Sequence, residues 1–272
     1  MFNNKSILIT GGTGSYGICL INKLIKNYTP RRIIIYSRDE LKQFELSKKL
    51  SVFKSKALRF LIGDIRDKDR LNWATKEVDY IIHSAALKQV PTGEYNPFEV
   101  IKTNIVGSQN VVESAINNNV EKVISLSTDK AVSPINLYGA SKLCADKLFI
   151  SSNNIKGKKK ISFSVVRYGN VMGSRGSVLP EFLKQSQRGY FKITDKQMTR
   201  FNISLSEAVD MVIWTLDNAI GGEIIVPKIP SFRIIDLAKT INNKLKFKLI
   251  GVRKGEKIHE DLISKADSLN TY

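Results

Sequence analysis

Four side chains that can exchange protons lie close together in the stretch "STDKAVSPINLYGASK", which runs from Ser127 to Lys142. Tyr138 and Lys142 are four residues apart, so a helix beginning here would place both on one face. An ammonium beside a phenol lowers the pKa of the phenol, and such a pair can take a proton from a substrate hydroxyl. Asp129 and Lys130 are neighbours, and they suit either acid–base chemistry or a salt bridge within a loop. Whether the pair performs acid–base chemistry or forms a salt bridge depends on the strands and helices that position these side chains.

Strands and helices are predicted to alternate through residues 1–171. Continuous apolar runs rich in β-branched residues predict six buried strands, in "SILIT", "RIIIYS", "LRFLIGDIRD", "VDYIIHSAA", "KVISLST" and "SFSVVRYGN". Helices are expected over Ile18–Ile25, from about Asp39, around Asp67–Thr75, over Phe98–Asn118 and over Leu137–Asn153. This alternation is typical of an α/β fold with a doubly wound parallel sheet, of the Rossmann type, covered on both faces.

After about Val171 the regular alternation ends. Helices are expected at Val178–Arg188, Leu205–Asn218 and Ile235–Asn243, and short strands at Gly222–Val226 and Lys248–Gly251. We therefore predict two parts. Residues 1–171 form a cofactor-binding domain that carries the catalytic residues, and residues 172–272 form a smaller, mixed and interleaved α/β lobe that mostly binds substrate.

A glycine-rich turn follows the first predicted strand. In "TGGTGSYG", Gly11, Gly14 and Gly17 precede a helix, which is the context of a dinucleotide pyrophosphate site. The alternative is a tight turn without a ligand. Loops after the second, third and fourth strands meet at the same edge, where ligands bind in open sheets. The predicted cofactor contacts are Gly11, Thr13, Gly14, Ser15, Tyr16, Gly17, Ser37, Arg38, Lys42, Asp64, Ile65, Ala85, Ala86, Lys88, Asn104, Tyr138 and Lys142.

The end of the second strand bears on which nicotinamide cofactor is used. NAD sites usually have an acidic residue at this place, for the ribose hydroxyls. Here Ser37 and Arg38 take it, with Lys42 one helical turn later. Both cations could pair with a 2′-phosphate, which favours NADP over NAD. The acidic Asp39 nearby leaves NAD as the alternative cofactor. Arg38 and Lys42 are alternatively solvated residues at the start of a helix, without a role in binding.

Charge and cysteine content indicate which partners and which cellular compartment to expect. The formal net charge of the 272 residues is +18, which fits a nucleic-acid binder, an enzyme for anionic substrates, or solvated lysines. The basic residues are scattered apart from "KGKKK", so we expect no nucleic-acid partner. Cys19 and Cys144 are expected to be buried free thiols in a reducing cytoplasm. We expect neither a signal peptide nor a membrane anchor.

Together the glycine turn, "ST" and "YGASK" resemble the extended short-chain dehydrogenase/reductase family. Further segments narrow the resemblance: "YSRDELK", "AALKQVP", "EYNPFEVIKTNIVGSQNV", "RYGNVMGSRGSVLP", "MTRF", "GGEIIVPKIPS" and "GVRKGEKIHE". With "STDKAVSPINLYGASK", they are similar to inverting UDP-N-acetylglucosamine 4,6-dehydratases, which begin pseudaminic acid synthesis. The resemblance covers nearly the whole chain, although the chain ends soon after "GEKIHE", where relatives usually continue.

This resemblance implies a role for each residue of the opening stretch. Tyr138, assisted by Lys142, would oxidise the sugar at carbon 4 with a tightly bound, recycled NADP. Lys130 would take the carbon 5 proton, which requires a neutral amine. Asp129 would protonate the departing 6-hydroxyl, and Thr128 would polarise the carbon 4 oxygen. Retaining dehydratases of the superfamily carry Asp-Glu at this pair, so Asp-Lys favours inversion at carbon 5.

Substrate-binding residues are also implied, largely by the resemblance. They are Lys88, Asn170, Arg175, Ser177, Thr199, Arg200, Arg253 and Glu256. Arginine forks suit the diphosphate, and a glutamate suits ribose hydroxyls; surface charge is the alternative for each arginine. His83 and His259 are expected to be structural, and no cluster has the spacing of metal ligands. The resemblance also implies a homo-oligomer, a dimer or a hexamer.

Two other functions remain open. A nucleotide-sugar 4-epimerase or reductase would share the fold, but a simple 4-epimerase needs no acid–base pair for carbons 5 and 6. A non-catalytic NADP-sensing or nucleic-acid-binding module would not require the intact Tyr-x-x-x-Lys pair. Asp129 and Lys130 are therefore the discriminating feature for UDP-N-acetylglucosamine dehydration.

Overall fold

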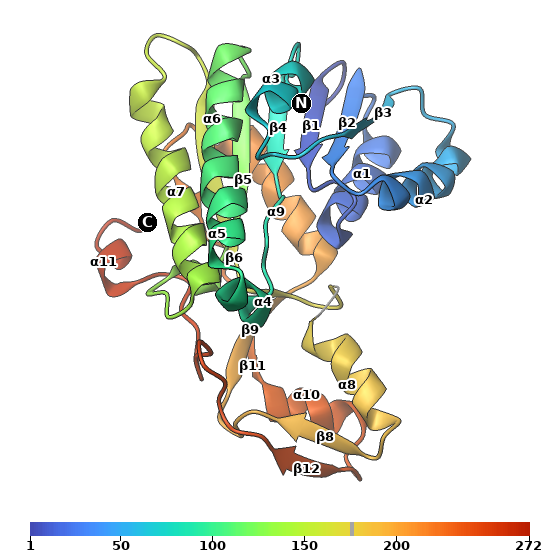
Figure 1. The fold of residues 1–272 in the computed structure, drawn as a ribbon, viewed down its shortest axis with the longest axis vertical. Coiled ribbons are helices and arrows are strands. Elements are labelled where there is room, and N and C mark those ends of the chain that lie inside the picture. The colour runs from blue at the N-terminus through green and yellow to red at the C-terminus, as the bar shows by residue number, and fades with distance from the viewer. Residues whose placement is uncertain (175–176) are drawn as a thin grey trace.

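The computed structural model describes residues 1–174 and 177–272, and Figure 1 shows a large sheet region with a smaller lobe below it. The large sheet has seven parallel strands in the order β10-β6-β5-β4-β1-β2-β3. Its strands are β1 (Ser6–Thr10), β2 (Arg32–Ser37), β3 (Leu58–Ile62), β4 (Tyr80–His83), β5 (Lys122–Thr128), β6 (Ser162–Tyr168) and β10 (Ile224–Ile225). The order reverses between β1 and β4, which is where ligands bind in open α/β sheets. The predicted doubly wound fold is confirmed.

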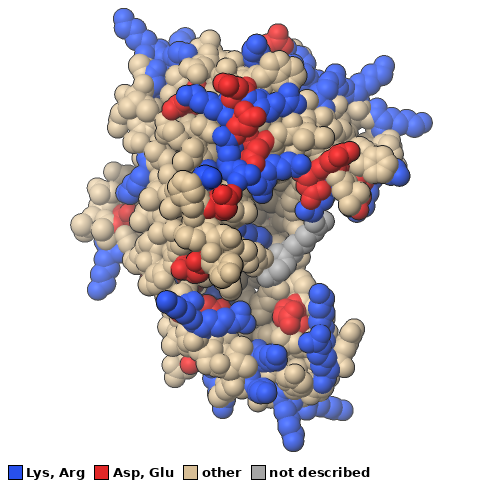
Figure 2. Space-filling model, viewed as in Figure 1, with Lys and Arg blue, Asp and Glu red and all other residues tan. Residues whose placement is uncertain are grey.

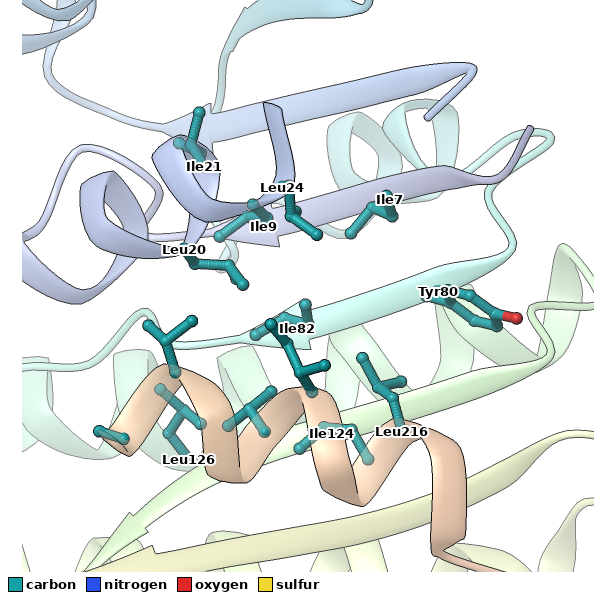
Figure 3. Packing of buried hydrophobic residues seen from close by; sticks show 14 of the residues in the cluster. Ile7, Ile9, Leu20, Ile21, Leu24, Tyr80, Ile82, Ile124, Leu126 and Leu216 are labelled. Carbon is teal, nitrogen blue, oxygen red and sulfur yellow. The ribbon is translucent and has the colours of Figure 1, made fainter. Parts of the chain in front are cut away.

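Alternating side chains of the strands build a core on each face of this sheet. Ile7 and Ile9 pack with helices α1 (Ser15–Asn27), α2 (Glu40–Leu50) and α9 (Leu205–Asn218). In Figure 3, Leu216 from α9 and the leucines of α1 point toward the strands. Leu8 faces the opposite core, with α3 (Lys68–Ala74), α6 (Gly107–Asn117) and α7 (Leu137–Ile155). Each such buried aliphatic side chain contributes about 1.5–3 kcal/mol, so both faces must be covered.

The long helix predicted over Phe98–Asn118 contains a change of helical type. It consists of α5 (Pro97–Val100), a π-helical segment, η2 (Ile101–Val106), and α6. The wider turn directs Thr103 and Asn104 inward, and both are buried. A short helix before it, α4 (Val90–Tyr95), was not expected, because its sequence "VPTGEY" contains both a proline and a glycine.

The smaller lobe has its own core, formed around Phe182, Phe191 and Ile234. Helices α8 (Val178–Ser186) and α10 (Ile234–Ile241) pack with a parallel pair, β8 (Tyr190–Ile193) and β12 (Lys246–Leu249). A second small sheet joins β7 (Asn170–Val171), β9 (Thr199–Ile203) and β11 (Ser231–Arg233). The remaining short helices are η1 (Ser51–Phe53), η3 (Asp129–Ala131) and α11 (Lys265–Ser268).

The structure of residues 172–272 agrees with some of the predicted elements and contains others that were not predicted. The three predicted helices and the strands near β10 and β12 are present, whereas β8, β9 and β11 were not expected. Helix α9 packs on the large sheet and β10 extends it, so the two parts interleave. The prediction that Cys144 is buried is wrong, because its position on α7 faces solvent; Cys19 is partly buried. Within the described residues, each helix is too short or too polar to cross a membrane.

The glycine turn packs helix α1 tightly against the end of β1. A Cβ atom on Gly17 would lie 2.5 Å from the carbonyl oxygen of Gly12, so the helix can approach only because this residue has no side chain. Gly11 has a φ of +68°, and a Cβ there would lie 3.0 Å from the backbone of Ala85. The turn therefore holds β1, α1 and the loop after β4 together.

We predict that Gly17→Ala lowers the free energy of unfolding by about 1–3 kcal/mol, since the added methyl group meets backbone that cannot rotate away. Asn27→Ala, an exposed change at the end of the same helix, should stay within about 0.5 kcal/mol of the parent. Urea denaturation followed by circular dichroism measures both. Equal stability of the two variants would contradict the close packing inferred for Gly17.

Candidate active site

Two cavities meet at the carboxyl edge of the large sheet. The first has a volume of about 630 Å³ and extends from the glycine turn past β2 and β4 to α7. The second has a volume of about 600 Å³ and lies between α8, β9 and the segment that follows β12. Lys130, Asn170 and Ser177 line both cavities. An elongated ligand can therefore lie across both, with Lys130 at the junction.

The first cavity brings together nearly all of the predicted cofactor contacts. They come from the glycine turn, the β2 end, the β3 and β4 loops and α7: Gly11, Thr13, Gly14, Ser15, Tyr16, Gly17, Ser37, Arg38, Lys42, Asp64, Ile65, Ala85, Ala86, Lys88, Tyr138 and Lys142. Lys88 is partly desolvated there, and burial lowers its pKa.

Asn104 is a predicted cofactor contact that lies elsewhere. Its side-chain amide donates to the carbonyl of Leu87 and to Ser141 Oγ, both at 2.9 Å, and its oxygen accepts from the Leu87 amide at 2.8 Å. All of these bonds are internal, and Asn104 is 2% exposed. Asn104 therefore fixes the loop after β4 against α7 instead of lining the cavity.

The cations after β2 have acidic neighbours in this structure. Arg38 Nη1 lies 3.5 Å from Asp64 Oδ2, and Lys42 Nζ donates to Asp39 Oδ2 at 2.5 Å. Asp39 also caps α2 by accepting from the Lys42 backbone amide. Burial disfavours the Asp64 carboxylate, yet its bonds with Arg66 hold its pKa below the ordinary value. Both Arg38 and Lys42 remain about half exposed at the cavity rim.

Tyr138 and Lys142 lie on one face of α7, as their spacing predicted, and both line the first cavity. Lys142 Nζ donates to the carbonyl of Leu126 at 2.5 Å, and burial lowers the pKa of the Lys142 amine. Desolvation raises the pKa of the Tyr138 phenol well above its ordinary value, although a hydrogen bond with Thr128 opposes the shift. Lys142 is not among the groups that shift the pKa of Tyr138 in this structure, and its amine donates to the backbone instead.

Asp129 and Lys130 form the short helix η3 directly after β5. The Asp129 carboxylate is fully buried and accepts from Thr128 Oγ1 at 2.9 Å and from Lys130 Nζ at 2.8 Å. Lys130 Nζ also lies 3.5 Å from Asn170 Oδ1. The amine and the carboxyl group are thus in direct contact, and a proton can pass between them without a bridging group.

The second cavity contains most of the predicted substrate contacts: Asn170, Ser177, Arg200, Arg253 and Glu256. Arg200 is mostly committed to the backbone, because it donates to the carbonyl oxygens of Thr199, Lys257 and Ile258. Thr199 does not line either cavity described above; a hydrogen bond of 2.8 Å joins its hydroxyl to His259 Nδ1. Arg175 lies outside the described residues.

Both histidines have the internal contacts expected of structural residues. His83 is buried, and its two nitrogens bond Thr10 Oγ1 at 2.8 Å and Ser108 Oγ at 3.3 Å. Burial lowers its pKa to about 3, so the ring is neutral in the folded protein near pH 7. His259 is exposed. Within the described residues, no group of three or more His, Cys, Asp or Glu side chains could hold a metal ion.

Sequence reasoning missed two buried carboxylates near the site. Asp146 lies one turn after Lys142, fully buried, and pairs with Arg167 at 3.2 Å while accepting from Ser127 Oγ at 2.7 Å. Glu260 approaches Lys130 from the C-terminal segment, at 3.7 Å. The spacing of four between Lys142 and Asp146 was a readable signal. Glu260 ends the motif "GVRKGEKIHE", but 130 positions separate it from Lys130, so no spacing indicated their contact.

Charged side chains are spread widely over one face of the molecule. On the face seen in Figure 2, Lys and Arg are dispersed over the sheet region and the smaller lobe and are interspersed with Asp and Glu. On this face the distribution agrees with the scatter of basic residues along the chain.

Comparison with known proteins gives a consistent picture. A polysaccharide biosynthesis protein family model matches residues 7–272. A Campylobacter jejuni UDP-N-acetylglucosamine 4,6-dehydratase (inverting) is 56% identical over 274 residues, which covers 100% of this chain and 81% of that protein. A Rickettsia bellii UDP-glucose 4-epimerase is 45% identical, covering 100% and 83% of the two chains.

A solved structure agrees with these relatives. The X-ray structure of Pen from Bacillus thuringiensis superimposes with a TM-score of 0.93 and 40% sequence identity, covering 99% of this chain and 84% of that one. The resemblance to inverting dehydratases that the motifs indicated is thereby confirmed at the level of the whole chain. The chain belongs to the polysaccharide biosynthesis protein family.

Proposed function

We propose that the protein converts UDP-N-acetylglucosamine to a 6-deoxy-4-keto sugar nucleotide with inversion at carbon 5, using NADP. The observation that carries this proposal is the direct 2.8 Å bond between Asp129 and Lys130, at the junction of the two cavities. The identity of 56% to the Campylobacter jejuni UDP-N-acetylglucosamine 4,6-dehydratase (inverting) supports the same substrate and reaction.

The first cavity fits a nicotinamide dinucleotide. A side chain at Gly11 would fill the cradle beside Ala85, and the backbone amides at the start of α1 suit a pyrophosphate. When bound there, the nicotinamide would supply reversible hydride transfer. Tyr138 Oη would take the proton of the carbon 4 hydroxyl, and Thr128, which shares a hydrogen bond with Tyr138, would hold the same oxygen.

Asp129 and Lys130 would then carry out the loss of water. Once carbon 4 is a ketone, the carbon 5 proton is acidic, and the neutral Lys130 amine removes it. The Asp129 carboxyl protonates the departing 6-hydroxyl, which leaves as water. These two transfers leave an ammonium beside a carboxylate, and proton transfer across their 2.8 Å bond restores the starting pair. The hydride taken from carbon 4 would be returned by the bound nicotinamide to carbon 6, which completes the 6-deoxy group. A proton from solvent, delivered to carbon 5 from the opposite face, would complete the inversion.

The finer assignments are part of the same proposal. We assign the cofactor to residues 1–171 and most substrate contacts to residues 172–272, with a homo-oligomer as the assembly. We place the product in surface-glycan synthesis, as the pseudaminic acid pathway would require. A 4-epimerase is the alternative function, and the 45% identity to the Rickettsia bellii UDP-glucose 4-epimerase favours it.

Incubation of the protein with UDP-N-acetylglucosamine and NADP in deuterated water tests the reaction. We expect a product lighter than the substrate by one water apart from incorporated deuterium, with deuterium at carbon 5 and inverted stereochemistry there, observed by mass spectrometry and NMR. Unchanged substrate mass together with a 4-epimer would support the epimerase and contradict dehydration.

Lys130→Ala should lower product formation by roughly 10²–10⁴-fold, the contribution of a general base. Oxidation at carbon 4 should persist, because Tyr138 and Lys142 are intact, and absorbance of the reduced nicotinamide measures it. Lys147→Ala makes the same change at an exposed position of α7 and should match the parent. Product at the parental rate in Lys130→Ala would show that another group removes the carbon 5 proton.

Arg38→Ala should weaken NADP binding by about 10–100-fold, because a charge-assisted hydrogen bond contributes about 1.5–3 kcal/mol. Binding of NAD should change little, and titration calorimetry with each dinucleotide measures the ratio of dissociation constants. Arg59→Ala removes an exposed arginine from β3 and serves as the control. An unaltered ratio in Arg38→Ala would argue against recognition of the 2′-phosphate by this residue.

A further inference from the structure

Glu260 is a buried carboxylate beside the acid–base pair. Its side chain is 4% exposed, although the segment that carries it, after β12, has no regular secondary structure. Glutamate is almost never buried unless it is paired. Its Oε1 lies 3.7 Å from Lys130 Nζ and its Oε2 lies 3.8 Å from Lys257 Nζ, while Oε2 has no hydrogen-bond partner within the described residues.

Other bonds hold this segment in place without using the Glu260 carboxylate. Arg200 donates to the carbonyls of Lys257 and Ile258, and the Thr199 amide donates to Ile258 O at 3.1 Å. Lys257 Nζ donates to the carbonyl of Val132, two residues after Lys130, at 2.6 Å. The segment is therefore anchored to β9 and to the residue that follows η3 through backbone oxygens. Anchoring alone gives no reason for a buried carboxylate at position 260.

The charges around Glu260 come from three elements. Asp129 and Lys130 face it from η3, Arg200 from β9 and Lys257 from its own segment. Burial raises the pKa of Glu260 above its ordinary value, and the three cations oppose that shift while Asp129 adds to it. A carboxylate in such surroundings is most stable when a cation lies beside it. Lys130 acquires its positive charge when it removes the substrate proton.

We propose that Glu260 is a positioning residue that holds Lys130 Nζ at the junction of the two cavities and stabilises the charge that Lys130 gains. This inference rests on the proposed dehydration. With Asp129 on one side and Glu260 on the other, the amine is bounded by two carboxylates and by the amide oxygen of Asn170. Asp129 gives up its proton to the leaving hydroxyl during the reaction. Glu260 transfers no proton in the proposed mechanism, so its interaction with Lys130 stays the same throughout.

Glu260→Gln keeps the shape of the side chain and removes its charge. We expect kcat for the dehydrated product to fall about tenfold, with KM nearly unchanged, because the amine becomes a weaker base. The acid limb of the pH profile for carbon 5 deuterium exchange should move to lower pH by about one unit, since an uncharged neighbour no longer favours the ammonium form. Carbon 4 oxidation should stay within about twofold of the parent, as it does not use Lys130.

The adjacent Asp261→Asn is the matched control, because it removes an exposed carboxylate from the same segment. It should leave both kcat and the pH profile unchanged. Glu260→Asp, which keeps the charge, should retain the parental position of the acid limb and lose less activity than Glu260→Gln. This variant also tests the proposal if the glutamine variant does not fold.

The outcomes separate the two proposals. If the parent protein incorporates no deuterium at carbon 5, the proposed dehydration itself fails. If the parent does so and Glu260→Gln has the parental acid limb, the positioning role is overturned, even where thermal stability and kcat fall together. The same holds if Glu260→Asp moves the acid limb to lower pH, as expected for loss of the charge.

Discussion

The site depends on one contact between backbones, where the first turn of α7 meets η3. A Cβ atom on Gly139 would lie 2.2 Å from the carbonyl oxygen of Lys130, so the two segments can touch only because residue 139 is glycine. Asn136 caps the helix at this point by accepting from the Gly139 amide at 2.8 Å. Tyr138, in the first turn of α7, is therefore held against η3, which carries the acid–base pair. The residues proposed for oxidation and for elimination share one rigid support, which suits two steps on a single sugar ring.

The segment after β12 packs against α7 and η3 from the side of the smaller lobe. Asn136 Nδ2 donates to the carbonyl of Gly255, and Lys257 reaches the carbonyl of Val132. Further along, Arg167 on β6 pairs with Asp146 of α7 and also with Asp267 at 3.4 Å. A buried ion pair adds little net stability, because desolvation offsets the attraction, but breaking it leaves an uncompensated charge. Its geometry therefore fixes α7, β6 and the end of the chain relative to one another.

The parts of this arrangement that are local in sequence could be predicted, and the parts that depend on distant contacts could not. The β-branched runs predicted six strands, and the glycine turn predicted the start of the first helix. The spacing of Tyr138 and Lys142 predicted that both lie on one face of α7. Asn104 was misjudged because a π-helical turn, invisible in an apolar pattern, directs it to the backbone of Leu87. Glu260 meets Lys130 only after the chain has passed through the smaller lobe, so no periodicity or spacing in the sequence indicates their contact.

The electrostatics of the site show why filling the cavity matters for its chemistry. Desolvation raises the pKa of Tyr138 and lowers that of Lys142, so burial alone favours the neutral phenol and the neutral amine. The proposed oxidation needs the phenolate, and a neighbouring positive charge is what stabilises it. Lys142 can provide that charge only if its proton is retained against burial, and in this structure its nitrogen is bonded to Leu126. An anionic dinucleotide in the cavity would stabilise the ammonium form of Lys142. In the proposed function, a dinucleotide bound in the first cavity would therefore favour the charge state of Lys142 that the first proton transfer requires.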